Sequence, residues 1–294
     1  MSWLQLHLTV DKERAPLIEL VFENLGALSV TLGDAEDDPQ LEPKPGESPL
    51  WQQTRVTGLF AGDSDADELR NAINQALNED VSRHLQLEIL QDQAWERAWM
   101  DAFHPMQFGK RLWICPTGQQ VSADNAVIVD LDPGLAFGTG THPTTALCLS
   151  WLDNQSLAGK TVIDFGCGSG ILAVAALLLG AESAIAIDHD PQALEATLAN
   201  AQKNGVEDRL IIHDSEQPPE QPCDILLANI LASTLVDLEP LLASLTKPGG
   251  EIALSGILHN QTLDVLNAYQ GDFKILQTER LEEWMLIAGQ RLSS

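Results

Sequence analysis

The chain has 294 residues, 44% of them hydrophobic, and its 43 acidic against 16 basic side chains give a net charge of −27. That length accommodates two domains with separate cores, and no run reaches the roughly 18 apolar residues that a membrane span needs. A negative field of this size repels phosphate backbones and attracts basic proteins, so we expect no general nucleic-acid binding. The alternative is that the net charge only keeps the protein soluble.

Residues 1–92 are expected to form a small domain. Leu4, Leu6, Leu8 and Val10 alternate on one face of a strand, and the segment that follows has helical spacing up to Gly26. The order of expected elements is β-α-β-β-α-β, which is typical of a ferredoxin-like α+β domain. Its residues leave two roles open, substrate recognition and a structural appendage. The expected strands are 4–10, 27–32, 54–60 and 84–90, and the expected helices are 11–25 and 65–78.

Residues 93–110 are expected to be a linker helix, with its helical composition concentrated in residues 93–103. Trp95 and Trp99 lie at helical spacing within it. They fit either a hinge surface or an ordinary core. The chain is expected to return to extended structure at residues 112–115.

Residues 111–294 predict a second, larger domain. Short apolar runs alternate with helical stretches, as in a parallel sheet covered on both faces. This pattern indicates a doubly wound α/β fold, with a turn at Pro248-Gly249-Gly250 before its closing strands. The expected parallel strands are 161–165, 184–187, 210–213 and 225–228, and the expected closing strands are 251–255, 273–277 and 284–289.

The four cysteines are far apart and lack the paired C-x-x-C spacing of a zinc site. We expect buried thiols, a reducing compartment and no metal. The first residues do not resemble a secretory signal, and a cytoplasmic location is expected. The cysteines are Cys115, Cys148, Cys167 and Cys223.

The strongest motif runs from Val162 to Gly170, where a buried strand enters a G-x-G-x-G turn and then a helix. Glycines there let the backbone approach a ligand, but such a turn alone is a weak signal. Asp188, 22 positions after Gly166, ends the next expected strand. Its carboxylate can accept hydrogen bonds from both hydroxyls of a ribose, so the ligand is expected to carry a nucleoside.

Asp164 helps to choose the nucleoside. A dinucleotide has a pyrophosphate that this carboxylate would repel, whereas S-adenosylmethionine has an ammonium group that it could orient. The turn therefore favours S-adenosylmethionine. The alternative is that Asp164 caps nearby backbone amides.

Two further stretches are expected at the same sheet edge. Asn229 ends a strand and can offer its side-chain oxygen to an amine, or it caps a turn. A glycine-rich loop over residues 131–145 could be a lid or an ordinary helix start. Pro143 suits a first helical turn, with Thr141 or His142 as its cap. His142 is also a possible proton acceptor, although a structural role is the plainer interpretation.

These motifs resemble those of the PrmA-type ribosomal protein methyltransferases, which modify protein eleven of the large subunit. The resemblance covers nearly the whole chain and is carried by the runs at 95–105, 137–145, 164–170 and 228–231. It implies a seven-stranded class I methyltransferase domain that transfers methyl groups from S-adenosylmethionine to lysine side chains and the N-terminal amine. It also implies that the small domain binds the basic ribosomal protein.

The resemblance also assigns residues by position. Asn229 would orient the acceptor amine as well as contact the cofactor. Relatives that methylate glutamine or adenine amides carry Asn-Pro-Pro-Tyr where this chain has Asn229-Ile230-Leu231-Ala232, which argues against a planar acceptor. A monomer is expected. The expected cofactor contacts are Phe137, Thr145, Asp164, Gly166, Gly168, Asp188 and Asn229.

Two functions of other classes compete with this hypothesis. A nicotinamide-dependent oxidoreductase would need a pyrophosphate cradle, which the spacing of the glycines disfavours. The second competing function is that of a regulator or assembly factor, which would bind the cofactor without catalysing a reaction.

Overall fold

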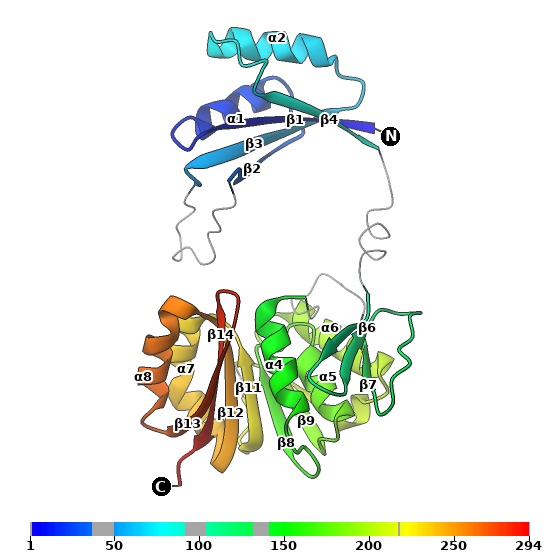
Figure 1. The fold of residues 1–294 in the computed structure, drawn as a ribbon, viewed down its shortest axis with the longest axis vertical. Coiled ribbons are helices and arrows are strands. Elements are labelled where there is room, and N and C mark those ends of the chain that lie inside the picture. The colour runs from blue at the N-terminus through cyan, green and yellow to red at the C-terminus, as the bar shows by residue number, and fades with distance from the viewer. Residues whose placement is uncertain (1, 37–49, 92–103, 132–140, 217, 294) are drawn as a thin grey trace. The chain divides into compact units, whose positions relative to one another are not determined.

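The computed structural model describes residues 2–36, 50–91, 104–131, 141–216 and 218–293. The chain divides into two compact units, Met1–Trp95 and Glu96–Ser294 (Figure 1). No helix in the described ranges combines the length and apolar character that a membrane crossing requires.

The first unit has the predicted ferredoxin-like order. Its antiparallel sheet has the strand order β2-β3-β1-β4. Leu4, Leu6 and Leu8 alternate along β1 and are buried with Ile18 and Phe22 of α1. The elements are β1 (Ser2–Asp11), α1 (Ala15–Asn24), β2 (Ser29–Asp34), β3 (Gln53–Ala61), α2 (Ala66–Leu77) and β4 (Leu85–Gln91).

The first helix begins four residues later than predicted. β1 continues to Asp11, and α1 starts at Ala15 with a proline in its first turn, where the missing amide is not needed. The second helix, α2, begins as predicted, directly after its N-cap residue Asp65. The Asp65 carboxylate accepts hydrogen bonds from the amides of Asp67 and Glu68.

The predicted linker helix is wrong where it can be compared. Residues 93–103, with Trp95 and Trp99, lie outside the described residues, but β5 (Met106–Phe108) is a strand. It pairs antiparallel with β6 (Leu112–Cys115), which pairs parallel with β7 (Val127–Asp130). The tight turn between β5 and β6 explains the difference, because Gly109 has a positive φ of 67° that ends any helix.

A buried carboxylate fixes that turn to a helix of the second unit. Asp153, at the end of α4 (Pro143–Asp153), accepts hydrogen bonds from the amides of Lys110 and Arg111 at 2.6 and 3.1 Å. The Asp153 side chain has no exposed surface. The three-stranded sheet is therefore attached to the helix that leads into the main sheet.

The main sheet has seven strands in the order β10-β9-β8-β11-β12-β14-β13. The first five run parallel, and β14 and β13 close the sheet antiparallel. This is the doubly wound class I methyltransferase arrangement that the resemblance implied. Its strands are β8 (Thr161–Phe165), β9 (Ser183–Asp188), β10 (Leu210–Asp214), β11 (Cys223–Asn229), β12 (Thr246–Leu258), β13 (Phe273–Leu281) and β14 (Trp284–Arg291).

Helices cover both faces of this sheet (Figure 1). Alternate residues of a strand enter opposite cores: Leu227 of β11 packs toward α4 and α5, and Leu226 packs toward α7 and α8. Burial on both faces explains the continuous apolar runs of the parallel strands. The remaining helices are α5 (Ile171–Leu178), α6 (Pro191–Lys203), α7 (Ala232–Leu245) and α8 (Thr262–Tyr269), with short 3₁₀ helices at Glu207–Arg209 and His259–Gln261.

The turn predicted at Pro248-Gly249-Gly250 is part of a strand. β12 starts at Thr246, and its register with β11 shifts between Cys223 and Ile225, so the prolyl-glycyl segment is accommodated as an irregularity. Bulges tolerate proline and a positive φ, which Gly249 has.

Candidate active site

Polar residues gather at the carboxyl edge of the parallel sheet. Asp164 lies near the end of β8, Asp188 ends β9, and Asn229 ends β11. In open α/β sheets this edge is where ligands bind, because the loops diverge and helix N-termini point toward it.

The glycine turn after β8 is held to the neighbouring strand. The amides of Gly166 and Cys167 both donate to the carbonyl of Ile187, at 2.8 and 3.0 Å. Gly166 has φ of 75°, and a Cβ there would lie 2.3 Å from Cγ2 of Ile230. Only glycine fits this position, and its lack of a side chain keeps the backbone at the sheet edge accessible.

Asp188 supports the same turn. Its Oδ2 accepts a hydrogen bond from the amide of Gly168 at 2.9 Å, and its Oδ1 accepts one from the amide of Asp190 at 3.0 Å. Nδ1 of the exposed His189 also lies 3.4 Å from Oδ1, and because a carboxylate has about four acceptor positions, Oδ2 still has one for a hydroxyl group of a ligand. The structure thus brings Gly166, Gly168 and Asp188 together, as the spacing predicted.

Asp164 is the most deeply buried of these carboxyls, with 1% of its surface exposed. Its Oδ2 accepts a hydrogen bond from the amide of Ala173 at 3.0 Å, as the capping alternative predicted. Its Oδ1 has no partner in the described parts of the chain. Burial raises the pKa of Asp164 to about 7, against the Ala173 hydrogen bond, and the charge of Asp188 adds to the rise. The unpartnered oxygen is buried and lacks the hydrogen bond or cation that usually accompanies a buried carboxyl oxygen.

Asn229 and Thr145 meet at this edge. The Asn229 side-chain amide donates to the Thr145 hydroxyl at 3.4 Å, from β11 to the first turn of α4. Thr145 is 1% exposed, so its side chain orients Asn229 and offers little surface to a ligand. Because the amide nitrogen is used in this way, the Asn229 oxygen is left to accept a hydrogen bond.

His142 caps α4, which confirms one of the two predicted caps. Its Nδ1 accepts from the amide of Thr144 at 3.3 Å, and Pro143 occupies the first turn. Its ring packs edge-on against Trp284, with centroids 4.8 Å apart. Burial lowers the pKa of His142, with Glu282 opposing the shift. These contacts favour the structural interpretation of His142.

Phe137 and most of the predicted lid loop lie outside the described residues.

Two residues of α6 hold the turn from its other side, and neither was predicted. The Thr197 hydroxyl donates to the carbonyl of Gly168 at 3.0 Å, and the Asn200 amide donates to the carbonyl of Ser169 at 2.8 Å. Polar residues at i and i+3 on the helix after Asp188 were the available signal. Cys167 is also packed here, with Sγ 3.3 Å from the Thr197 hydroxyl, and burial raises the pKa of its thiol.

Comparison with known proteins agrees with this geometry. The sequence profile of the family described as "Ribosomal protein L11 methyltransferase (PrmA)" matches residues 2–292. The chain belongs to this family. A ribosomal protein L11 methyltransferase of Hahella chejuensis is 54% identical over 292 residues, covering 99% of each chain. One of Azotobacter vinelandii is 52% identical over 292 residues, covering 99% of this chain and 100% of the relative.

A solved structure shows the same fold. The ribosomal protein L11 methylase of Lactobacillus delbrueckii subsp. bulgaricus is 33% identical, with a TM-score of 0.60, and the match covers 65% of this chain and all of the other. Membership in the L11 methyltransferase family confirms the predicted fold class and rules out the oxidoreductase alternative.

The L11 methyltransferase family uses S-adenosylmethionine, and the described residues fit it. The glycine turn has no Lys or Arg for a pyrophosphate, Asp188 has an acceptor position free for a ribose, and Asp164 has a buried unpartnered oxygen for an ammonium group. In the described ranges, no group of three or more His, Cys, Asp or Glu side chains could hold a metal ion.

Proposed function

We propose that this enzyme transfers methyl groups from S-adenosylmethionine to lysine side-chain amines and the N-terminal amine of ribosomal protein L11. The relatives are named for that substrate. The observation that carries the amine specificity is Asn229, whose oxygen is left to accept from an amine while Thr145 holds its nitrogen. The residues after it, Ile230-Leu231-Ala232, lack the prolines and tyrosine expected for a planar amide or base.

Each remaining site residue has a proposed role toward the cofactor. Asp188 accepts from a ribose hydroxyl, and Asp164 offers its unpartnered oxygen to the ammonium group. Gly166 and Gly168 allow close approach of the backbone, and Thr145 acts through Asn229. Phe137 is proposed as a further contact, from the resemblance alone.

The acceptor must lose a proton before it can react. A free lysine has a pKa near 10.4, so presenting its neutral form at pH 7 costs about 4–5 kcal/mol. The cofactor supplies a methyl group on a sulfonium, and this chain supplies orientation and exclusion of water around the amine. Asn229 fixes the direction of the nitrogen lone pair. No general base is assigned, because His142 uses its Nδ1 to cap α4.

The organisation of the chain is part of the proposal. Residues 1–92 would recognise the substrate, residues 93–110 would link, and residues 111–294 would carry the reaction. The chain would act as a monomer in the cytoplasm, where a ribosomal substrate is made. The four cysteines are free and buried, as suits a reducing compartment.

The test is a labelling experiment. The purified full chain, radiolabelled S-adenosylmethionine and an extract of ribosomal proteins should give label in L11, at lysines and the N-terminal amine when mapped by mass spectrometry. Asn229→Ala should lose most of this label, a much larger loss than the weakening of S-adenosylhomocysteine binding that its expected cofactor contact implies, since it removes the group that orients the amine. Binding of the cofactor without any labelled protein would favour the non-catalytic alternative.

A further inference from the structure

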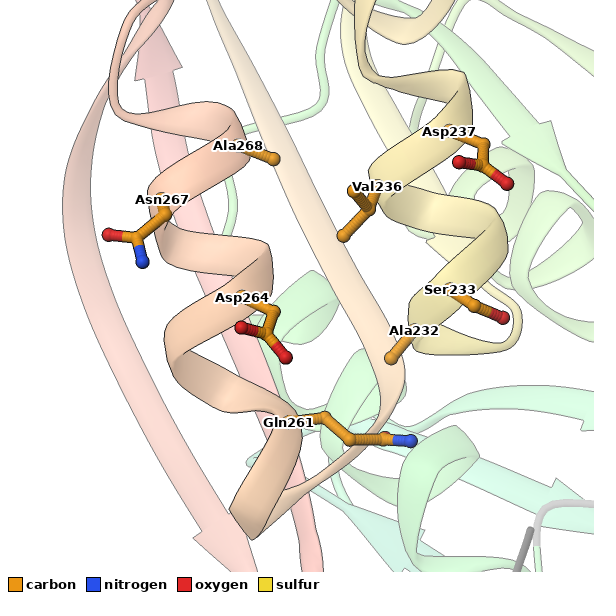
Figure 2. Close-up of a pocket in the computed structure, with 8 residues that line it drawn as sticks. All are labelled: Ala232, Ser233, Val236, Asp237, Gln261, Asp264, Asn267 and Ala268. Atoms are coloured by element: carbon orange, nitrogen blue, oxygen red, sulfur yellow. The ribbon is translucent and has the colours of Figure 1, made fainter. Parts of the chain in front are cut away.

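A groove runs between α7 and α8 on one face of the main sheet (Figure 2). Its volume is about 640 Å³, enough for several side chains of a peptide. Both helices begin at the carboxyl edge of the sheet, just after β11 and β12. The α7–α8 groove is lined by Ala232, Ser233, Val236, Asp237, Gln261, Asp264, Asn267 and Ala268.

The middle of the groove is apolar. Val236 and Ala268 face one another from the two helices, and Ala232 lies beside them at the start of α7 (Figure 2). Ala232 is buried, and Val236 and Ala268 are half-buried, so the floor is exposed enough to receive another apolar group. The methylene stem of a lysine packs well on a surface of this kind.

Each helix also contributes one exposed carboxylate, Asp237 from α7 and Asp264 from α8. Neither makes an ion pair with another described residue, and the lining contains no Lys, Arg or His. An anion such as phosphate would be repelled here, whereas an ammonium group would find a carboxylate at either side of an apolar floor.

The groove starts close to the proposed acceptor position. Ala232 follows Asn229 by three residues, and three residues of chain span at most about 11 Å. An extended peptide advances about 3.3 Å per residue. A substrate with one amine at Asn229 would therefore place residues three or four positions away at the mouth of the groove.

We propose that the α7–α8 groove binds a second, lysine-bearing stretch of the protein substrate that flanks the amine being methylated. This inference rests on the proposed function and deepens it. The apolar floor receives the aliphatic stem of the lysine, and its ammonium group pairs with one of the two carboxylates, Asp264 or Asp237.

Charge reversal tests the groove in the full chain. The variant Asp237→Lys with Asp264→Lys is compared with a control, Glu182→Lys with Glu195→Lys, which changes two exposed carboxylates on the β9–α6 side and the net charge equally. The groove variant should raise KM for L11 about tenfold, and kcat and the Kd for S-adenosylhomocysteine should stay within about twofold. The control should raise KM much less.

A binding measurement separates the two proposals. The Kd for L11, measured calorimetrically with enzyme saturated with S-adenosylhomocysteine, should rise with KM in the groove variant. If the unsubstituted enzyme bound L11 without methylating it, the proposed function would fall and this comparison would still decide the groove. Equal losses in both variants would overturn the groove proposal. So would an altered oligomeric state with unchanged L11 affinity, which would assign the groove to a second copy of the chain.

Discussion

Two carboxyl groups at the ends of neighbouring strands have different surroundings. Asp188 receives a backbone hydrogen bond on each oxygen, from the amides of Gly168 and Asp190. Asp164 receives one, has an unpartnered oxygen and is fully enclosed, so burial raises its pKa to about 7. The sheet therefore places a fully hydrogen-bonded carboxyl group beside one whose second oxygen is buried without a partner in the described chain.

Asp164 should make stability depend on pH. The native state holds its proton up to about pH 7, whereas the unfolded chain loses it near 3.8, so the free energy of unfolding falls as pH rises between these values. The effect is ~1.4 kcal/mol for each pKa unit. Asp164→Asn should remove this slope. Urea unfolding of both proteins at the two ends of the window measures it, and parallel pH dependences would contradict the assignment.

Asp188 should govern cofactor affinity through its charge. Asp188→Asn keeps an oxygen for the amide of Gly168 and removes the second acceptor, so the Kd for S-adenosylhomocysteine should rise about tenfold or more, and the melting temperature should fall because the amide of Asp190 loses its acceptor. Asp190→Asn removes the same charge two residues away and keeps a good helix cap, and it should bind nearly normally. Calorimetric titration compares the two. Equal losses of affinity in the two variants would show that the negative charge of this region, and not the acceptor position of Asp188, determines cofactor binding.

At the scale of elements, one side chain joins the small sheet to the domain. Asp153 accepts both amides at the β5–β6 turn without any exposed surface. Asp153→Ala leaves those amides unpaired and should lower the free energy of unfolding by about 2–4 kcal/mol, as seen in urea denaturation. Ser150→Ala on the same helix should change it by less than about 0.5 kcal/mol. A small effect at Asp153 would mean that water replaces its hydrogen bonds.

Strands with strong periodicity were predictable, whereas of the three short strands of the small sheet only β6 was expected, at residues 112–115. β1 and β8 have unmistakable alternation or a continuous apolar run, and both were located to within two residues. β5 and β7 have only three and four residues, too few for any period to appear. β5 depends on a turn held by the distant Asp153 carboxylate, and β7 depends on parallel pairing with β6. The Pro248–Gly250 bulge was missed because the pairs that place it inside a strand, Cys223 with Thr246 and Ile225 with Glu251, form only in the folded sheet.

The site residues that follow predicted strands could be identified from the sequence. The glycine turn, Asp188 and Asn229 could be found from the sequence because each follows a strand that ends at the same edge. Thr197 and Asn200 were missed, because their partners are backbone carbonyls of the turn and the only signal was their i, i+3 spacing on the helix after Asp188.

At the scale of the whole molecule, the charge of −27 should act on the encounter with the substrate. A basic protein is attracted over about a Debye length, ~8 Å at physiological ionic strength, and salt shortens this range. The value of kcat/KM for L11 should fall about tenfold or more as salt is raised, while kcat at saturating L11 stays nearly constant. Initial rates across a salt series measure both. A salt-independent kcat/KM would contradict electrostatic steering.

Cys167 lies inside the glycine turn, and its reactivity can report how often that turn separates from α6. Cys167 is enclosed by α6 and stays a neutral thiol, and thiols react with alkylating agents only as exposed thiolates. Its alkylation therefore requires the turn to separate from Thr197, and any ligand that binds the closed turn slows that reaction. The rate of modification at Cys167, read by mass spectrometry, thus measures how often the cofactor cradle opens in the native state.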